Sequence, residues 1–223
     1  MRLTRKPDRG VDDRAALDAF LDEQLSGVLA TVHEGRPHVI PIAYARDGDR
    51  LLFHGSTGAG ALRMAADGAP VSFCVHAVDA IRLSYNGLHH SVNYRSAVVA
   101  GVATRLTGDE HWAALDLLVD LLVPGRNSEI VPVASKDAAK TMTLALPISD
   151  GHWLMKARTG QLARADEAPD DVWMGTVPLN VVAGDPVPAT GQDPGLLPPA
   201  SVLRFMAARP NPGGRDANRP GVV

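Results

Sequence analysis

One short polar run combines hydroxyl groups, glycines and an imidazole. His54-Gly55-Ser56-Thr57-Gly58 follows an apolar stretch and precedes a predicted short helix over residues 61–66. Backbone amides and hydroxyls in such a loop suit a phosphate. The run lacks the Gly-Lys-Ser/Thr of a P-loop and does not read Gly-x-Gly-x-x-Gly. It therefore predicts either a phosphate-binding loop or a plain connection.

A second run is the densest polar stretch beside a predicted buried strand. It reads His89-His90-Ser91-Val92-Asn93-Tyr94-Arg95-Ser96. Adjacent histidines on a strand point to opposite faces, so the pair is not expected to chelate one ion. Buried polar side chains need partners or a ligand. The run indicates either a structural hydrogen-bond network or part of a binding site.

Two further groups of residues have simpler interpretations. Lys156 and Arg158 place two cations close together, able to pair with a phosphate or with the acidic residues at 166 and 167. His33 and His38 are five residues apart rather than four, and Gly35 and Pro37 stand between them. Glycine and proline would break the helix that a zinc protease uses to present both ligands. This segment predicts a hairpin turn, and we expect no metal site.

Charge and cysteine content exclude several functions. The 223 residues include 22 Lys and Arg against 25 Asp and Glu, a formal net charge of −3. No basic excess is available for phosphate neutralisation, so we expect no nucleic-acid partner. Cys74 is a single cysteine, which excludes an internal disulfide. No signal peptide and no apolar stretch of about 20 residues is evident, so we expect a cytoplasmic protein without a membrane anchor.

Hydrophobic spacing predicts the elements that must position these residues. Leu17, Phe20, Leu21 and Leu25 recur at helical spacing. Apolar runs over residues 28–32, 38–44 and 51–54 are joined by turn residues and predict an antiparallel meander. Pro41 would delete a ladder hydrogen bond, which indicates a bulge or an edge position. Further strands are expected over 71–76, 98–103 and 141–146, with a helix over 112–122.

These elements predict a mainly β protein, a barrel with added helices. We expect an N-terminal arm over residues 1–11, a barrel domain over 12–183 and a C-terminal extension over 184–223. The extension is rich in proline and glycine, which prevents long regular elements. One short helix is expected at 200–208, with a disordered tail beyond it.

The order of these segments carries a resemblance to a known family. The chain is similar to the pyridoxamine 5′-phosphate oxidase-related FMN-binding proteins, in the branch of the nitroimidazole-resistance (Nim) proteins. The resemblance spans about residues 12–183. After the first helix it rests on seven segments in order: Gly27-Val28-Leu29-Ala30-Thr31, Gly35-Arg36-Pro37-His38-Val39-Ile40-Pro41-Ile42-Ala43-Tyr44, Leu51-Leu52-Phe53-His54-Gly55-Ser56-Thr57-Gly58, His89-His90-Ser91-Val92-Asn93-Tyr94-Arg95-Ser96, Leu122-Val123-Pro124-Gly125-Arg126, Lys156-Ala157-Arg158-Thr159-Gly160 and Trp173-Met174-Gly175-Thr176-Val177-Pro178-Leu179.

The resemblance implies a six-stranded antiparallel split β-barrel of Greek-key type, which forms a homodimer with FMN in clefts at the subunit interface. Backbone groups of one strand would face the flavin ring, a loop would hold the ribityl phosphate, and later polar residues would complete the pocket. In that order the implied residues are Pro41, Ile42, Ala43 and Tyr44; His54, Gly55, Ser56 and Thr57; and Asn93, Tyr94, Arg95, Lys156, Arg158 and Trp173.

Two departures from the family pattern concern the phosphate. Relatives commonly carry a cation where this chain has Gly60, and an arginine where it has Ser84-Tyr85-Asn86. Arg63, one helical turn after Gly60, is expected to compensate. If it does not, the same barrel could hold haem, with His89 or His90 as a candidate iron ligand.

The leading hypothesis is therefore an FMN-dependent oxidoreductase that acts on a small molecule. The cofactor would perform the electron chemistry and the protein would orient it. His54 and His90 are the candidates for groups near the reacting atoms, because neutral imidazole can donate or accept a proton near pH 7. The alternatives are a flavin-binding module without turnover and a haem-binding enzyme on the same barrel.

Overall fold

The computed structural model describes residue 1 and residues 3–193 and 195–210. Within these residues the strands are β1 (Gly10–Val11), β2 (Ser26–His33), β3 (Arg36–Asp47), β4 (Arg50–Ser56), β5 (Pro70–Leu83), β6 (Ser91–Val102), β7 (Thr104–Arg105), β8 (Thr141–Pro147), β9 (Trp153–Arg158) and β10 (Gly175–Pro178). The α-helices are α1 (Arg14–Glu23), α2 (Gly60–Ala66), α3 (Gly108–Leu122), α4 (Ser135–Ala138) and α5 (Ala200–Ala207). Short 3-10 turns are η1 (Pro7–Arg9), η2 (Gly87–His89) and η3 (Arg126–Glu129).

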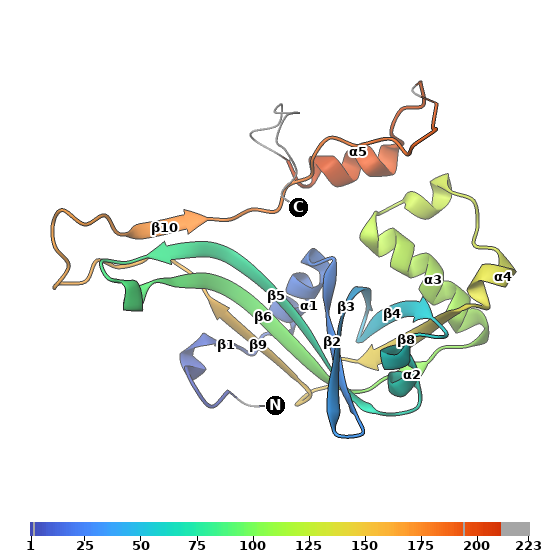
Figure 1. Cartoon of the computed structure of the whole chain (residues 1–223), viewed down its shortest axis with the longest axis horizontal. Coiled ribbons are helices and arrows are strands. Elements are labelled where there is room, and N and C mark those ends of the chain that lie inside the picture. Colours follow the sequence, from blue (N-terminus) through green and yellow to red (C-terminus); the bar gives the residue numbers. More distant parts are fainter. Residues whose placement is uncertain (2, 194, 211–223) are drawn as a thin grey trace.

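The strands form one antiparallel sheet that curls back on itself (Figure 1). The order is β1-β9-β6-β5-β2-β3-β4-β8-β7, and β7 follows β6 after Ala103 alone. Because β7 pairs with β8, the β6–β7 segment closes a ring through β5, β2, β3, β4 and β8. The prediction of a mainly β, antiparallel fold with added helices is confirmed.

The expected meander is formed by β2, β3 and β4. Glu34 and Gly35, with φ of 50° and 73°, form the tight turn between β2 and β3; positive φ at both turn residues matches the right-handed twist of the flanking strands. Pro41 pairs with Val28 of β2. On its other side, β3 pairs with β4 only from Tyr44 to Asp47. Pro41 therefore lies at a locally free edge. Of the two positions expected for a residue without an amide hydrogen, a bulge or an edge, it occupies the edge.

The core lies inside the curled sheet and beneath α1. Val71, Phe73 and Val75 point inward from β5, and Phe73 contacts the rings of Tyr44 and Phe53 at 4.9 and 4.8 Å between centroids. The alternation sends Cys74 and His76 to the opposite, outer side of β5. Leu17 and the other apolar residues of α1 close the inner side.

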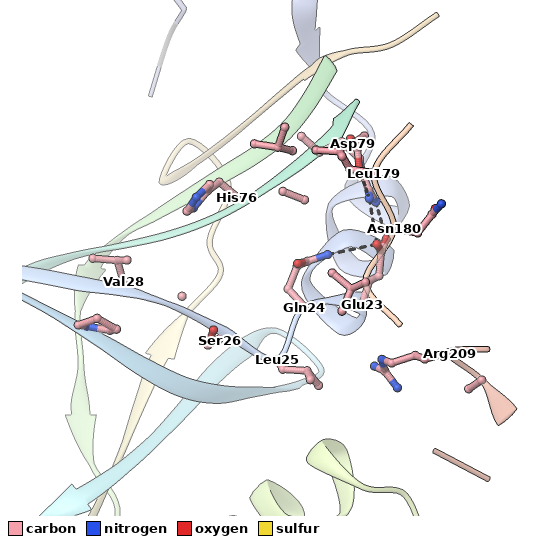
Figure 2. Close-up of a pocket in the computed structure, with 17 residues that line it drawn as sticks. Glu23, Gln24, Leu25, Ser26, Val28, His76, Asp79, Leu179, Asn180 and Arg209 are labelled. Atoms are coloured by element: carbon pink, nitrogen blue, oxygen red, sulfur yellow. Dashed lines mark hydrogen bonds and ion pairs between the residues drawn. The ribbon is translucent and has the colours of Figure 1, made fainter. Parts of the chain in front are cut away.

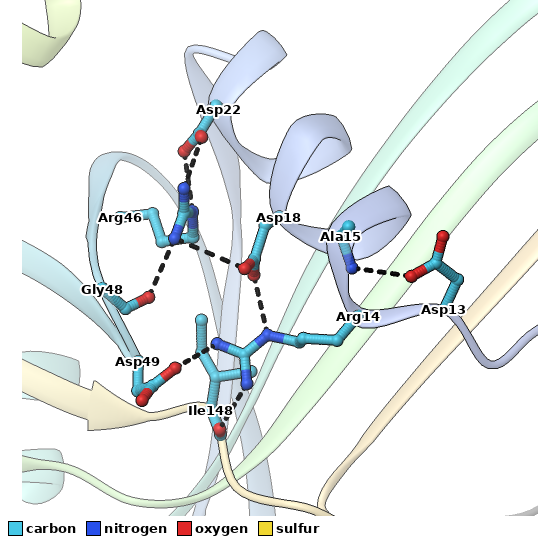
Figure 3. Close-up of polar contacts among 9 residues, drawn as sticks. All are labelled: Asp13, Arg14, Ala15, Asp18, Asp22, Arg46, Gly48, Asp49 and Ile148. Atoms are coloured by element: carbon cyan, nitrogen blue, oxygen red, sulfur yellow. Dashed lines mark hydrogen bonds and ion pairs between the residues drawn. The ribbon is translucent and has the colours of Figure 1, made fainter.

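Ion pairs hold α1 to the β3–β4 hairpin (Figure 3). Arg14 donates to Asp18 at 2.8 Å, to Asp49 at 2.7 Å and to the carbonyl of Ile148. Arg46 of β3 donates to Asp22 of α1 at 2.8 Å. This network fixes the end of α1 beside β2, where a cleft begins.

The long strand β5 has two different partners along one edge. β2 pairs with it from Val71 to Cys74, and β10 pairs with it from Ala80 to Leu83. A bulge between Val78 and Ala80 shifts the register with β6. The intervening segment around His76 and Asp79 therefore borders an opening between β2 and β10.

The C-terminal extension crosses this opening. After β10 the chain runs to α5, which lies near α3 and η3 (Figure 1). The helix expected at 200–208 is confirmed as Ala200–Ala207. The expected tail falls mostly on residues 211–223, outside the described residues. Within the described part of the chain, no helix is both long and apolar enough to span a membrane.

Candidate cofactor site

A cleft of about 840 Å³ occupies the opening between β2, β5 and the C-terminal extension (Figure 2). Its volume is within the range of small-molecule and cofactor sites, roughly 300–1,000 Å³. The lining residues come from the end of α1, four strands, the segment just after β10 and the C-terminal extension just after α5. They are Glu23, Gln24, Leu25, Ser26, Gly27, Val28, Pro41, His76, Ala77, Val78, Asp79, Arg95, Leu179, Asn180, Val181, Ala208 and Arg209.

The two cations of the cleft differ in availability. Arg95 donates to Asp79 at 2.7 Å and to Glu23 at 2.9 Å, and these hydrogen bonds, Glu23 first, raise its pKa above the ordinary value. Its charge is thus compensated. A phosphate that bound Arg95, as predicted, would have to compete with these two carboxylates. Arg209 lies 4.3 Å above the Phe205 ring. Within the described residues, no carboxylate forms an ion pair with it.

The predicted flavin strand and phosphate loop lie next to each other. The β3–β4 ladder ends at Tyr44 and Phe53, so Ala43 and His54 are the first residues beyond it. Pro41, Ile42 and Ala43 keep a free backbone edge there. Tyr44 does not: it pairs with Phe53, is 3% exposed and donates its hydroxyl to the carbonyl of Leu21 at 2.5 Å. Burial raises the pKa of Tyr44, which belongs to the core rather than to a binding surface.

The loop after β4 does not present the free amides that a phosphate cradle needs. Thr57 donates its amide to the carbonyl of Lys140 at 3.0 Å, and Gly58 donates to the Ser56 hydroxyl at 3.2 Å. The Ala59 amide donates to the Ser56 carbonyl at 2.9 Å. Gly55 packs under Leu62, which a Cβ would meet at 2.3 Å. The loop would therefore have to rearrange to bind phosphate through these amides, and the predicted role stays a prediction.

The predicted proton-transfer residues lie apart. His54 is an exposed residue of β4, and partial loss of hydration lowers its pKa, so its imidazole is neutral at pH 7. His90 is at the end of the β5–β6 connection, where its Nδ1 lies 2.8 Å from the carbonyl of Asn86. His89 lies 5.4 Å from the Tyr85 ring in the same connection. None of these histidines lines the cleft.

A buried arginine that the sequence analysis did not select lies near this connection. Arg82 of β5 is 7% exposed and donates to Asn93 Oδ1 at 3.0 Å and to the carbonyl of Gly160 at 3.1 Å. Asn93 donates to the same carbonyl at 2.9 Å. Arg158 donates to the hydroxyl of Ser91, the residue opposite Arg82 on β6, at 2.6 Å. Predicted residues Asn93 and Arg158 are thus brought together around Arg82.

This group, the Arg82 cluster (Arg82, Ser91, Asn93, Arg158 and Gly160), has unsatisfied polar atoms. Arg82 Nε and the hydroxyl of Thr176, which faces Arg82 across the β5–β10 ladder, are buried without a hydrogen-bond partner. Loss of hydration, followed by the charges of Arg82 and Arg9, lowers the pKa of Arg158. No carboxylate pairs with either arginine among the described residues. Because uncompensated buried cations are costly, the arrangement favours a bound anion.

The remaining predicted residues surround this region. Tyr94 pairs with Arg158 across β6 and β9. Lys156 donates to the carbonyl of Arg5 at 3.4 Å. Trp173 is 66% exposed and covers Gly175, where a Cβ would meet its ring at 2.6 Å. The sequence analysis missed Arg82; the signal that could have identified it is an arginine at the end of a mostly apolar strand.

The segments that form the barrel match the family model for pyridoxamine 5′-phosphate oxidase over residues 13–152. The chain belongs to this family. A comparison with curated proteins found no match. The family match begins at α1 and ends after β8, so it covers the closed ring of strands but not β10 or the C-terminal extension.

Two solved structures resemble this family member along almost its whole length. The FAD and Heme binding protein from Mycobacterium smegmatis is 36% identical, with a TM-score of 0.85 over 89% of this chain and 97% of that one. The Flavocytochrome Anf3 from Azotobacter vinelandii has a TM-score of 0.82 over 91% and 94%, at 24% identity, which shows the fold alone. The predicted split-barrel fold of this family is confirmed.

The predicted Nim-like branch is a more distant relation. A candidate 5-nitroimidazole antibiotic resistance protein from Bacteroides thetaiotaomicron has a TM-score of 0.56 and 16% identity, over 66% of this chain. That likeness again shows the fold alone. Within the pyridoxamine 5′-phosphate oxidase family, the chain is thus much more similar to the FAD and Heme binding protein.

Proposed function

We propose that this protein is a redox protein that binds a flavin nucleotide and haem. The observation that carries the proposal is the 36% identity with the FAD and Heme binding protein, which extends over both chains almost entirely. The two alternatives are a flavin-binding module without turnover and an FMN-dependent oxidoreductase of the Nim-like kind.

The flavin nucleotide is proposed to be FAD rather than FMN. FAD carries a diphosphate, and the Arg82 cluster offers two cations without carboxylate partners together with an orphaned donor at Arg82 Nε. Charge-assisted hydrogen bonds from guanidinium groups to phosphate are strong and directional. Ile42 and Ala43, beyond the end of the β3–β4 ladder, keep backbone groups free for a flat ring. A bound flavin supplies the hydride or electron transfer that side chains cannot perform.

His54 and a small-molecule substrate complete the proposed redox site. Its lowered pKa keeps the His54 imidazole neutral, the form that has a ring nitrogen able to accept a proton. It lies beside Ala43, at the end of the β3–β4 ladder, and so next to the proposed ring position. His90 is held by Asn86 at the hairpin end and would act only if a second subunit supplied the rest of its surroundings.

A homodimer is proposed as the working form. The outer side of the sheet exposes four valines, Val32, Val39, Val78 and Val102, at 42–61%. Strand register places them on the outer face: Val39 pairs with Ala30, which alternates with the buried Leu29 and Thr31, and Val102 pairs with Pro70, beside the buried Val71. A second copy of the chain would bury this outer sheet face and close the open side of the cleft. Exposed apolar patches of this kind mark interfaces.

The test is cofactor titration of the purified protein freed of bound groups. We expect FAD to bind more tightly than FMN, and FMN more tightly than riboflavin, because each phosphate adds contacts to arginine. Haem is expected to bind without displacing the flavin. Equal affinity for riboflavin and FAD would contradict the diphosphate assignment. Failure to bind haem while flavin binds would favour the flavin-only alternatives.

A further inference from the structure

His76 is the imidazole among the residues that line the cleft. It stands on the outer side of β5, since Val75 beside it points inward and is 1% exposed. In the part of the chain that the structure describes, no hydrogen bond or ion pair engages the His76 ring. The ring nitrogens are therefore free to bind a ligand in the cleft.

The cleft around His76 combines apolar side chains with polar ones, and the charges of its carboxylates, Glu23 and Asp79, are compensated by Arg95. Val28, Pro41 and Val78 line the sheet side of the cleft, and Leu179 and Val181 line the opposite side. Figure 2 places Arg209 across the cleft from His76, on the C-terminal extension. Its guanidinium stacks on Phe205 and lacks a carboxylate partner among the described residues, unlike that of Arg95.

Haem would make use of these three features together: the imidazole, the apolar walls and the arginine. Its iron is commonly bound by a histidine, and its macrocycle packs against apolar side chains. Its two propionates are anions that pair with arginine. His89 and His90, the ligands that the sequence suggested, lie at the β5–β6 connection instead and do not line the cleft.

We propose that His76 is the protein ligand of the haem iron and that Arg209 pairs with a haem propionate. This inference rests on the haem binding proposed above. It assigns the cleft, including Pro41, to haem and leaves the Arg82 cluster and the backbone of Ile42 and Ala43 to the flavin nucleotide. The C-terminal extension then acts as one wall of the haem site.

The experiment is haem titration of the full chain and of His76→Ala, followed by absorption and magnetic circular dichroism. His76→Ala should shift the Soret band and weaken haem binding by more than about tenfold, because even outer-shell partners of metal ligands contribute roughly 10- to 100-fold. Exogenous imidazole should restore the original spectrum in His76→Gly. Arg209→Met should weaken binding but leave the band position unchanged.

Matched controls separate this inference from the proposed function. His152→Ala removes an exposed histidine outside the cleft and should change neither spectrum nor affinity. FAD affinity reports whether each variant is folded. If the unmodified protein binds haem and His76→Ala binds it identically, the ligand assignment is wrong and haem binding stands. A spectrum lost only in His89→Ala or His90→Ala also overturns it. If the unmodified protein binds no haem, both proposals fail.

Discussion

Arg82 places a cation inside the protein, and within the part of the chain that the structure describes no carboxylate pairs with it. Its Nη1 is bound by Asn93 and Gly160, but its Nε has no partner. Sequence patterns favoured Arg95 instead, which lies in the polar run over residues 89–96, because it resembles a family site. In the folded chain Arg95 is bound by Glu23 and Asp79, which are 72 and 16 residues away. Such long-range ion pairs neutralise the charge of an arginine, and nothing in the neighbouring sequence indicates them.

Replacing Arg82 should affect phosphate recognition selectively. We expect Arg82→Met to weaken FAD binding by about 1.5–3 kcal/mol, the range for hydrogen bonds to charged groups, and to change riboflavin binding little. Arg105→Met, which removes an exposed arginine of β7, is the control. Calorimetric titration of both variants with FAD and riboflavin measures the difference. An equal loss for FAD and riboflavin would mean that Arg82 supports the fold rather than the diphosphate.

At the scale of elements, the sequence predicted the parts that depend on local periodicity. The β2–β3–β4 meander, α1 and α5 follow from apolar spacing and turn residues, and all are present. The opening between β2 and β10 was not predictable. It arises because β5 is long enough for two partners along one edge, and because a bulge after Val78 shifts its register. Neither the pairing of β5 with two partners nor its bulge can be predicted from the sequence of β5 alone.

The docking of α5 depends on one carboxylate and is expected to depend on pH. Glu129 of η3 accepts from the Ser201 amide at 3.0 Å and from its hydroxyl, and the hydroxyl bond is the main cause of its lowered pKa. A carboxyl with a lowered pKa in the folded state stabilises that state above its ordinary pKa, about 4.3. This stabilisation is lost as the pH falls through the lower, folded value.

Hydrogen exchange over residues 200–207 measures this dependence. After correction for intrinsic rates, protection of α5 should fall between about pH 6 and about pH 3. Glu129→Gln should show reduced protection already at the higher pH and little further change. Asp185→Asn, at an exposed position of the extension, should behave like the unmodified protein. Unchanged protection of α5 in Glu129→Gln would contradict this role.

For the whole molecule, the account predicts a dimer through the outer sheet face. Val39→Glu or Val102→Glu would place a charge at the centre of an apolar interface, so we expect both variants to be monomeric by light scattering. Val187→Glu changes a valine that is 89% exposed on the extension and should leave the dimer intact. A monomeric unmodified protein, with its cofactors bound, would rule out this interface.

The most direct test of the central claim is the absorption spectrum of the protein as purified from cells supplied with riboflavin and a haem precursor. The account predicts flavin bands and a Soret band in the same protein, with FAD as the flavin released on denaturation. A spectrum with flavin bands alone, and FMN as the released flavin, would contradict the two-cofactor assignment. It would instead support the alternative function, an FMN-dependent oxidoreductase of the Nim-like kind.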